Sequence, residues 1–235
     1  MQRKRSLGLA VLVGCLLMAG RAFAQTLTFE GLQDLEPIST FYDGGSGGFG
    51  STGGVDYGIT FGPDAIASIN DANGGTGNFA NNPSGDTTAY FIQGAGDVMN
   101  DTAGFTTGFS FYYSSIFSPG QVDVYSGLND TGTLLAQLNL AVTPEITPAP
   151  DGGAEIFDNW QAVGVAFSGV AESVDFTGTA NSIGFDDITI NSATAGSSGA
   201  TSVPEIGASG LASLVILLAG AMALLEAARV KPRHA

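Results

Sequence analysis

Short apolar segments recur along the middle of the chain, separated by clusters of Gly, Asn, Asp and Pro, which is typical of an all-β protein. Two segments alternate with period two. Phe105, Phe109, Phe111 and Tyr113 share one face of the first segment, and Leu134, Ala136, Leu138 and Leu140 share one face of the second. We expect strands at Leu27–Phe29, Tyr57–Phe61, Ala65–Ile69, Ala89–Ile92, Gly104–Tyr113, Val122–Tyr125, Leu134–Val142, Trp160–Phe167, Ser173–Phe176 and Ile183–Ile190. With no helical pattern between them, these strands predict an antiparallel two-sheet β-sandwich of the jelly-roll kind.

The segments between the predicted strands define one domain and its linker. Residues 25–190 are long enough to bury one sizeable core. Loops are expected at 43–54 and 71–86, and the Pro-containing segment 143–159 is expected to cross between the sheets. Residues 191–202 are rich in Ser, Gly and Ala and predict a flexible linker.

The N-terminus has the three parts of a secretory signal peptide, predicted at residues 1–24. A cationic start at residues 3–5 precedes an apolar stretch at 7–18, and Ala22-Phe23-Ala24 provides a cleavage site for signal peptidase. Leu12-Val13-Gly14-Cys15 also fits a lipoprotein box, but the apolar run continues past Cys15, which favours ordinary cleavage before Gln25.

The C-terminal segment 203–235 also has three ordered parts. Val203, Pro204 and Glu205, followed by Ile206, form a short polar motif, and residues 206–225 form an apolar stretch. As a helix, that stretch would span about 30 Å, the thickness of the hydrocarbon core of a bilayer. Arg229, Lys231 and Arg233 follow and would keep the end of the chain in the cytoplasm, so the domain is expected on the outside.

This tail resembles the PEP-CTERM class of bacterial sorting signals, in its variant that reads Val-Pro-Glu-Ile-Asp, with Gly207 here in place of Asp. The resemblance implies a transmembrane helix that anchors the protein for a time in the inner membrane and an exosortase-like membrane protease that processes the tail. A plain single-pass anchor is the alternative. The expected localisation is the cell surface or the extracellular space.

The charged residues are distributed very unevenly. No Lys, Arg, His or Cys occurs between Gln25 and Ala228, whereas twenty of the twenty-two acids lie between Gln25 and Ser202. Nucleic acid is therefore excluded as a direct partner, because its binding depends on Lys and Arg. Divalent cations are the expected counter-charge, and no disulfide framework is available.

The same absences remove most catalytic chemistry. Nucleophilic triads need an imidazole base, Schiff bases need Lys, and phosphoryl transfer needs cationic side chains. We therefore predict a protein that is not an enzyme. Glycoside hydrolysis by a pair of acids is the alternative, although the sequence identifies no such pair.

The body, at Phe29-Glu30-Gly31 and at residues 185–190 (Phe-Asp-Asp-Ile-Thr-Ile), resembles the lectin-like and carbohydrate-binding-module-like β-sandwiches of exported proteins. The resemblance implies that the first and last strands lie side by side. It also implies that Glu30, with Asp186 or Asp187 and backbone carbonyls, holds a structural calcium ion.

The spacing of the two aspartates limits this site. In a regular strand Asp187 shares a face with Ile183 and Phe185, and Asp186 shares the other face with Ile188 and Ile190. One carboxylate is then expected among apolar groups, where only a metal ion, backbone N–H groups or protonation can relieve it. Calcium suits such oxygen ligands, and capping by backbone amides is the alternative.

Two functions of different classes follow from the sequence. The domain either binds an extracellular polysaccharide, or it is an acidic structural component of a biofilm without a specific ligand. Trp160, the only tryptophan, is either a stacking platform for a sugar or part of the core.

Overall fold

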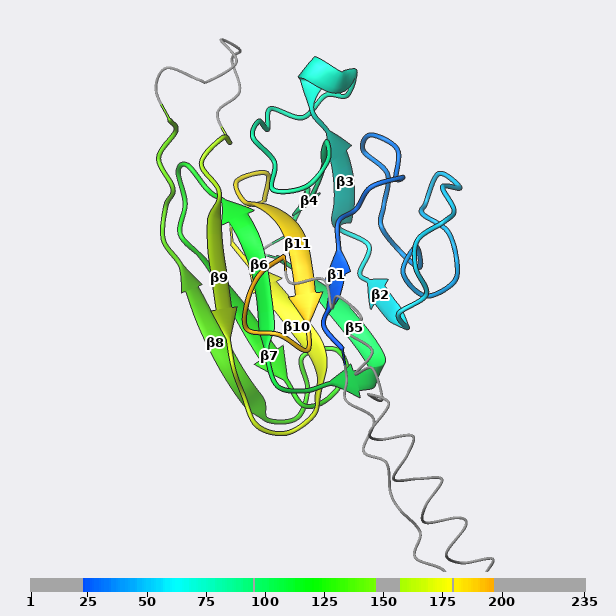
Figure 1. The fold of residues 1–235 in the computed structure, drawn as a ribbon, viewed down its shortest axis with the longest axis vertical. Helices are drawn as coiled ribbons and strands as arrows, with labels where there is room; N and C mark the ends of the chain where they lie inside the picture. Colours follow the sequence, from blue (N-terminus) through cyan, green and yellow to red (C-terminus); the bar gives the residue numbers. More distant parts are fainter. Residues whose placement is uncertain (1–22, 95, 147–156, 179, 197–235) are drawn as a thin grey trace, which may run out of the picture. The chain divides into compact units, whose positions relative to one another are not determined.

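The computed structural model describes residues 23–94, 96–146, 157–178 and 180–196. It confirms the predicted all-β fold with two antiparallel sheets (Figure 1). The first sheet contains β1 (Gln25–Leu27), β3 (Ala65–Ile69), β4 (Thr87–Phe91), β6 (Phe109–Ser114), β9 (Gln161–Val165) and β11 (Gly184–Ile190). The second contains β2 (Ile59–Phe61), β5 (Gly96–Phe105), β7 (Gly120–Tyr125), β8 (Leu134–Leu140) and β10 (Ala171–Thr177). A short 3-10 helix, η1 (Asp71–Asn73), follows β3.

The order of strands is β3-β4-β11-β6-β9 in the first sheet, with β1 also paired to β11, and β2-β5-β10-β7-β8 in the second. The segment that follows β8 therefore leads from the second sheet to β9 in the first, as the sequence predicts. Nearly all of residues 1–24, the linker beyond 196 and the whole tail from 203 lie outside the described residues. Within the described part of the chain, no helix is both long and apolar enough to cross a membrane.

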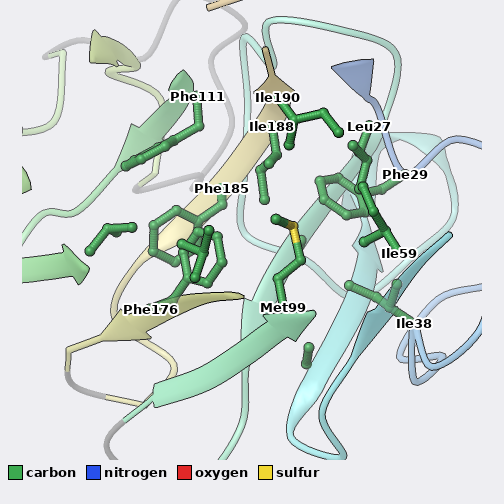
Figure 2. Packing of buried hydrophobic residues seen from close by; sticks show 14 of the residues in the cluster. Leu27, Phe29, Ile38, Ile59, Met99, Phe111, Phe176, Phe185, Ile188 and Ile190 are labelled. Atoms are coloured by element: carbon green, nitrogen blue, oxygen red, sulfur yellow. The ribbon is translucent and has the colours of Figure 1, made fainter. Parts of the chain in front are cut away.

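Aromatic side chains from both sheets fill the core (Figure 2). Phe111 on β6 lies 5.6 Å from Phe185 on β11 and 6.1 Å from Phe176 on β10, measured between ring centroids. Phe109 and Tyr113 are also fully buried, which confirms the alternation predicted for this face. The centre of the core is thus a set of rings in edge-to-face contact.

One strand, β5, is missing from the prediction, and the expected strand Gly104–Tyr113 is wrong because it joins the end of β5 to β6. The chain turns between them at Thr107, whose φ is 70°. Asp97, Met99, Asp101 and Phe105 occupy the buried positions of β5. Two acids at buried positions hide the alternation that identifies a strand.

The apolar face predicted for Leu134–Leu140 is also partly wrong. The β7–β8 pairing shifts register between Val124 and Tyr125, so that β8 carries one extra residue at Leu135. Leu134 is consequently 46% exposed, and Leu135 packs against the core in its place.

The glycine-rich loop at 43–54 closes around a buried carboxylate. Glu36 is fully buried, and its Oε1 accepts hydrogen bonds from the N–H groups of Phe49 (2.8 Å) and Ser51 (3.0 Å). A Cβ on Gly47 would lie 2.4 Å from the same oxygen, so the loop approaches this closely only because the residue is glycine. These bonds lower the pKa of Glu36 although its burial acts to raise it.

Candidate functional site

Asp186 and Asp187 lie on β11 between the part of the strand that pairs with β4 and the part that pairs with β1. Near its start β11 pairs with β4 at Phe185 and Ala89, and near its end it pairs with β1 at Ile188 and Leu27 (Figure 1). The first and last strands therefore lie side by side, as the resemblance implies. Asp186 and Asp187 occupy the interval between these two pairings.

A β-bulge changes the direction of the side chains in this interval. The register between β11 and β6 shifts between Asp186 and Thr189, and Asp187 has a φ of 50°. Phe185 and Ile188 therefore both belong to the core, although regular alternation would separate them. The prediction that one of the two aspartate side chains occupies a core-facing position of β11 is therefore wrong. The extra residue at the bulge leaves the core-facing positions to Phe185 and Ile188.

Asp186 is nevertheless fully buried, beneath the loop that precedes β4. Its carboxylate accepts hydrogen bonds from the N–H of Ser84 (3.0 Å), the hydroxyl of Ser84 (3.1 Å) and the N–H of Asp187 (2.7 Å). Burial, together with the charge of Asp187, raises the pKa of Asp186 to about 8. Burial also raises the pKa of Asp187.

Glu30 holds the same loop from its other side. Its Oε1 accepts the N–H groups of Asp86 (3.0 Å) and Thr87 (2.9 Å). Gly85 lies directly against this carboxylate, since a Cβ there would be 2.2 Å from Cδ of Glu30. Glu30 and Asp186 thus both accept hydrogen bonds from backbone N–H groups of the segment 84–87. Capping by backbone amides was the alternative to calcium that the sequence analysis gave for these acids.

These acids fit calcium in the chemistry of their oxygens but do not gather as a complete set of ligands. No three His, Cys, Asp or Glu side chains converge on a metal position within the part of the chain that the structure describes. A calcium ion at Glu30 and one of the two aspartates would therefore need backbone carbonyls and water to complete its coordination.

A second group of acids lies on the outer face of the second sheet. Asp123 on β7 is directly opposite Asp175 on β10, and Asp130 follows β7 in the next turn. Asp123 is only 7% exposed, and its buried Oδ1 accepts no hydrogen bond from the residues that the structure describes. Burial and the charges of Asp130 and Asp123 raise the pKa of Asp175 to about 6.

The structure also contains a cavity of about 230 Å³ that the sequence did not identify. Ser68 on β3 and Tyr90 on β4 form one wall. Because Ala67 and Ala89 face the core, this wall belongs to the outer surface of the first sheet. The remaining residues lining the cavity come from the loop after β3, the segment before β9 and the segment before β11: Thr76, Gly77, Asn78, Phe79, Phe157, Asn181 and Ile183.

The cavity has an apolar floor and a polar mouth. Phe79, Phe157 and Ile183 are buried, whereas Asn78 and Asn181 are exposed. The rings of Phe79 and Phe157 lie 5.2 Å apart, and Tyr90 lies 6.1 Å from Phe79. The side chains of Asn78, Tyr90 and Asn181 make no hydrogen bond to the residues that the structure describes, so their polar atoms are available to a ligand.

Two hydroxyl groups at the cavity are oriented by one carboxylate. Asp34 accepts hydrogen bonds from the hydroxyls of Thr76 (2.7 Å) and Ser68 (3.3 Å) and from the N–H of Ile69 (2.9 Å). These bonds lower the pKa of Asp34 although its burial acts to raise it. Because both hydroxyl protons point to Asp34, the lone pairs of the two oxygens remain free to accept from a ligand.

Trp160 adjoins this cavity through Phe79, with ring centroids 6.1 Å apart. Its Nε1–H donates to the carbonyl of Ala80 (2.8 Å), and the side chain is half-buried. Trp160 therefore belongs to a small aromatic cluster with Phe79 and Phe157, outside the main core. It is neither a fully exposed platform for a sugar nor part of the main core, the two roles considered from the sequence.

Comparison with protein-family models finds no match, and comparison with curated proteins finds none either. Among solved structures, the chain is similar to a family 6 carbohydrate-binding module from Cellvibrio mixtus lichenase 5A in complex with cellotriose. The identity is 12% and the TM-score 0.33, over 55% of this chain and 87% of that one. It is also similar to the family 11 carbohydrate-binding module from Clostridium thermocellum in complex with a mixed-linked tetrasaccharide, with 11% identity and a TM-score of 0.33 over 73% of this chain and 96% of that one.

A third similar structure is a family 43 arabinoxylan arabinofuranohydrolase from Bacillus subtilis, in complex with cellotetraose. The identity is 22% and the TM-score 0.37, over 56% of this chain and 25% of that one. The match thus spans only a quarter of the hydrolase. Because all three TM-scores are below 0.5, these similarities carry no argument about ligand or activity, and the function must be argued from the chain's own residues.

Proposed function

We propose that this chain is an exported, non-enzymatic surface or matrix protein whose β-sandwich binds an extracellular polysaccharide. The observation that carries the proposal is the cavity beside β3 and β4, which combines an aromatic floor with amide and phenol groups that make no hydrogen bond within the described part of the chain. Aromatic rings pack against the apolar faces of sugar rings, and amides and hydroxyls match sugar hydroxyls. The absence of Lys, Arg, His and Cys from residues 25–228 supports a binding role rather than catalysis.

Export and processing form the second part of the proposal. The signal peptide at 1–24 directs the chain across the membrane, and signal peptidase removes it. The helix at 206–225 holds the C-terminus in the membrane until an exosortase-like protease cleaves near Val203, Pro204 and Glu205. The support for this part is the confinement of all seven Lys and Arg residues to the two ends of the chain.

A structural calcium ion at Glu30 and one of Asp186 and Asp187 is the third part. Its support is the unusual burial of Asp186 beside a second carboxylate, without any cationic side chain in the body. Bound calcium would fix β11, β1 and the loop at 84–87 together. The ion has no catalytic role in this proposal.

The binding function is tested by retention on the exopolysaccharide of the producing cells. We expect immobilised polysaccharide to retain the protein, and a chelator to weaken retention by loosening the loop at 84–87. Tyr90→Ala should abolish most of the retention, because it removes one wall of the cavity. Tyr112→Ala is a matched control, since Tyr112 is a half-buried tyrosine on β6 that does not line the cavity.

Equal loss of retention with the Tyr112 control would show that the cavity is not the site. Failure of the wild-type protein to bind would instead favour the acidic structural component. The protein for this experiment should be recovered from the outside of the cells. Its intact mass should correspond to a chain that begins at Gln25 and ends near Val203, and full-length protein in the cytosol would contradict export.

A further inference from the structure

The cavity beside β3 and β4 differs from an open binding groove in its size. Its volume of about 230 Å³ is below the roughly 300–1,000 Å³ of pockets that hold drug-sized ligands. It therefore has room for about one sugar ring and not for several consecutive rings. A polysaccharide bound here must present a single residue to the protein.

The distribution of buried and exposed side chains around the cavity indicates whether a terminal or an internal sugar residue of the polysaccharide can enter it. Buried residues line the inner part of the cavity: Ser68 in the wall is 1% exposed, and Phe79 and Ile183 in the floor are 5% and 2% exposed. The exposed residues among those lining the cavity are Thr76, Asn78 and Asn181, and they face solvent at its mouth. A ring seated against these residues meets buried side chains on its inner side and exposed residues toward solvent, which fits the last residue of a chain.

The polar groups at the cavity determine the charge of that residue. The hydroxyls of Thr76 and Ser68 donate their protons to Asp34, so toward a ligand they can act only as hydrogen-bond acceptors. Asp34 also places a carboxylate directly behind this wall. No Lys, Arg or His occurs from Gln25 to Ala228 to balance the carboxylate of an acidic sugar.

We infer that this cavity binds the terminal residue of a neutral saccharide chain and discriminates against terminal uronic acids. The inference rests on the proposed saccharide-binding function and names the class of ligand and the part of the ligand that is recognised. The groups that make the contacts are the aromatic rings of Phe79 and Tyr90, the amides of Asn78 and Asn181, and the hydroxyls of Ser68, Thr76 and Tyr90. Binding at this site depends on chain ends, so long and short saccharides of one type bind with similar affinity.

The only tryptophan of the chain provides the readout, since Trp160 lies against Phe79 in the cavity floor. The full chain in mild detergent should be titrated, with Trp160 fluorescence as the signal. The probes are glucose, galactose, mannose, xylose and N-acetylglucosamine, their oligosaccharides up to the hexasaccharide, and glucuronic and galacturonic acids. For at least one neutral series, we expect saturable binding with an affinity that changes little from disaccharide to hexasaccharide.

Variants separate this site from general surface binding. Tyr90→Phe keeps the ring and removes one hydrogen bond, so it should weaken binding about three- to tenfold. The double substitution Asn78→Ala with Asn181→Ala should weaken it by about tenfold or more. Asn139→Ala is the control, because Asn139 is an exposed amide on β8 that does not line the cavity, and it should leave affinity unchanged.

The outcomes distinguish the inference from the function on which it rests. An affinity that rises steadily with chain length, or uronic acids that bind as well as the matching neutral sugars, would overturn the inference while saccharide binding stands. Retention on polysaccharide that survives both the Tyr90→Phe and the double asparagine substitution would overturn it as well. If no probe changes the fluorescence and the native polysaccharide retains no protein, the proposed function fails along with the inference.

Discussion

In buffers that contain a chelator, the sandwich should unfold at a lower temperature at pH 8 than at pH 5. Asp97, Asp175 and Asp186 have raised pKa values of about 6, about 6 and about 8, with burial as the main cause. In the unfolded chain, the same groups have the ordinary aspartate pKa of 3.8. Between these limits the native state binds more protons than the unfolded state, so stability falls as the pH rises.

Two other acids act in the opposite direction. Hydrogen bonds lower the pKa values of Asp34 and Glu36, so their contribution to stability is present at neutral pH and is lost in strong acid. The stability maximum should therefore lie near pH 4 to 5. From pH 5 to pH 8 we expect the melting temperature to fall by on the order of 10 °C, measured by calorimetry or circular dichroism.

Two substitutions assign this dependence to particular groups. Asp186→Asn should reduce the fall from about pH 4 upward and flatten it most between about pH 6 and pH 8, where, of these three groups, Asp186 alone still holds its proton in the native state. Asp175→Asn should flatten the part between pH 4 and pH 6 and leave the upper part as in the wild type. If Glu30 and Asp186 hold calcium, adding calcium should raise the melting temperature more at pH 8 than at pH 5. Stability that increases from pH 5 to pH 8 without calcium would contradict the burial of these carboxylates.

Phe111→Ala should destabilise the sandwich by about 3–5 kcal/mol. The ring of Phe111 lies within 6.3 Å of four other rings, those of Phe109, Tyr113, Phe176 and Phe185, measured between centroids. Its removal leaves a cavity between the two sheets that rigid neighbouring rings fill poorly (Figure 2). The melting temperature should fall by on the order of 10 °C or more.

Phe117→Ala is the matched control for this change. The same side chain is deleted, but Phe117 is 71% exposed and follows β6 in a loop. Its removal should change the free energy of unfolding by no more than about 0.5 kcal/mol. Similar losses for both variants, measured by denaturant unfolding, would contradict the assignment of Phe111 to the centre of the core.

The sequence predicted those strands in which the apolar residues occupy the buried positions. Phe109, Phe111 and Tyr113 alternate with polar residues and lie in the core, and β3 was predicted at its exact bounds. Strand β5 was missed because Asp97 and Asp101 occupy buried positions whose carboxylates bond to nearby backbone N–H groups. A pattern of apolar residues cannot reveal a strand whose buried positions are acidic.

The prediction of the side-chain directions of Asp186 and Asp187 was also wrong, because it assumed a regular strand. A single inserted residue at a bulge reverses the face of every residue beyond it, and no signal in this sequence marks the bulge before the pairing with β6 is known. The cavity was missed because its walls come from segments far apart along the chain, such as Ser68, Asn78, Phe157 and Asn181. Each of these residues taken alone suggests only a turn or an isolated apolar position.

The most direct test of the account is a crystal structure of the protein with a neutral oligosaccharide to which it binds. The inferred site predicts one terminal sugar ring in the cavity, in contact with Phe79 and Tyr90 and within hydrogen-bonding distance of the amides of Asn78 and Asn181. The remaining sugars should lie outside the cavity, toward solvent. A saccharide bound elsewhere, for example along the acidic outer face that carries Asp123 and Asp175, with no sugar in the cavity, would contradict it.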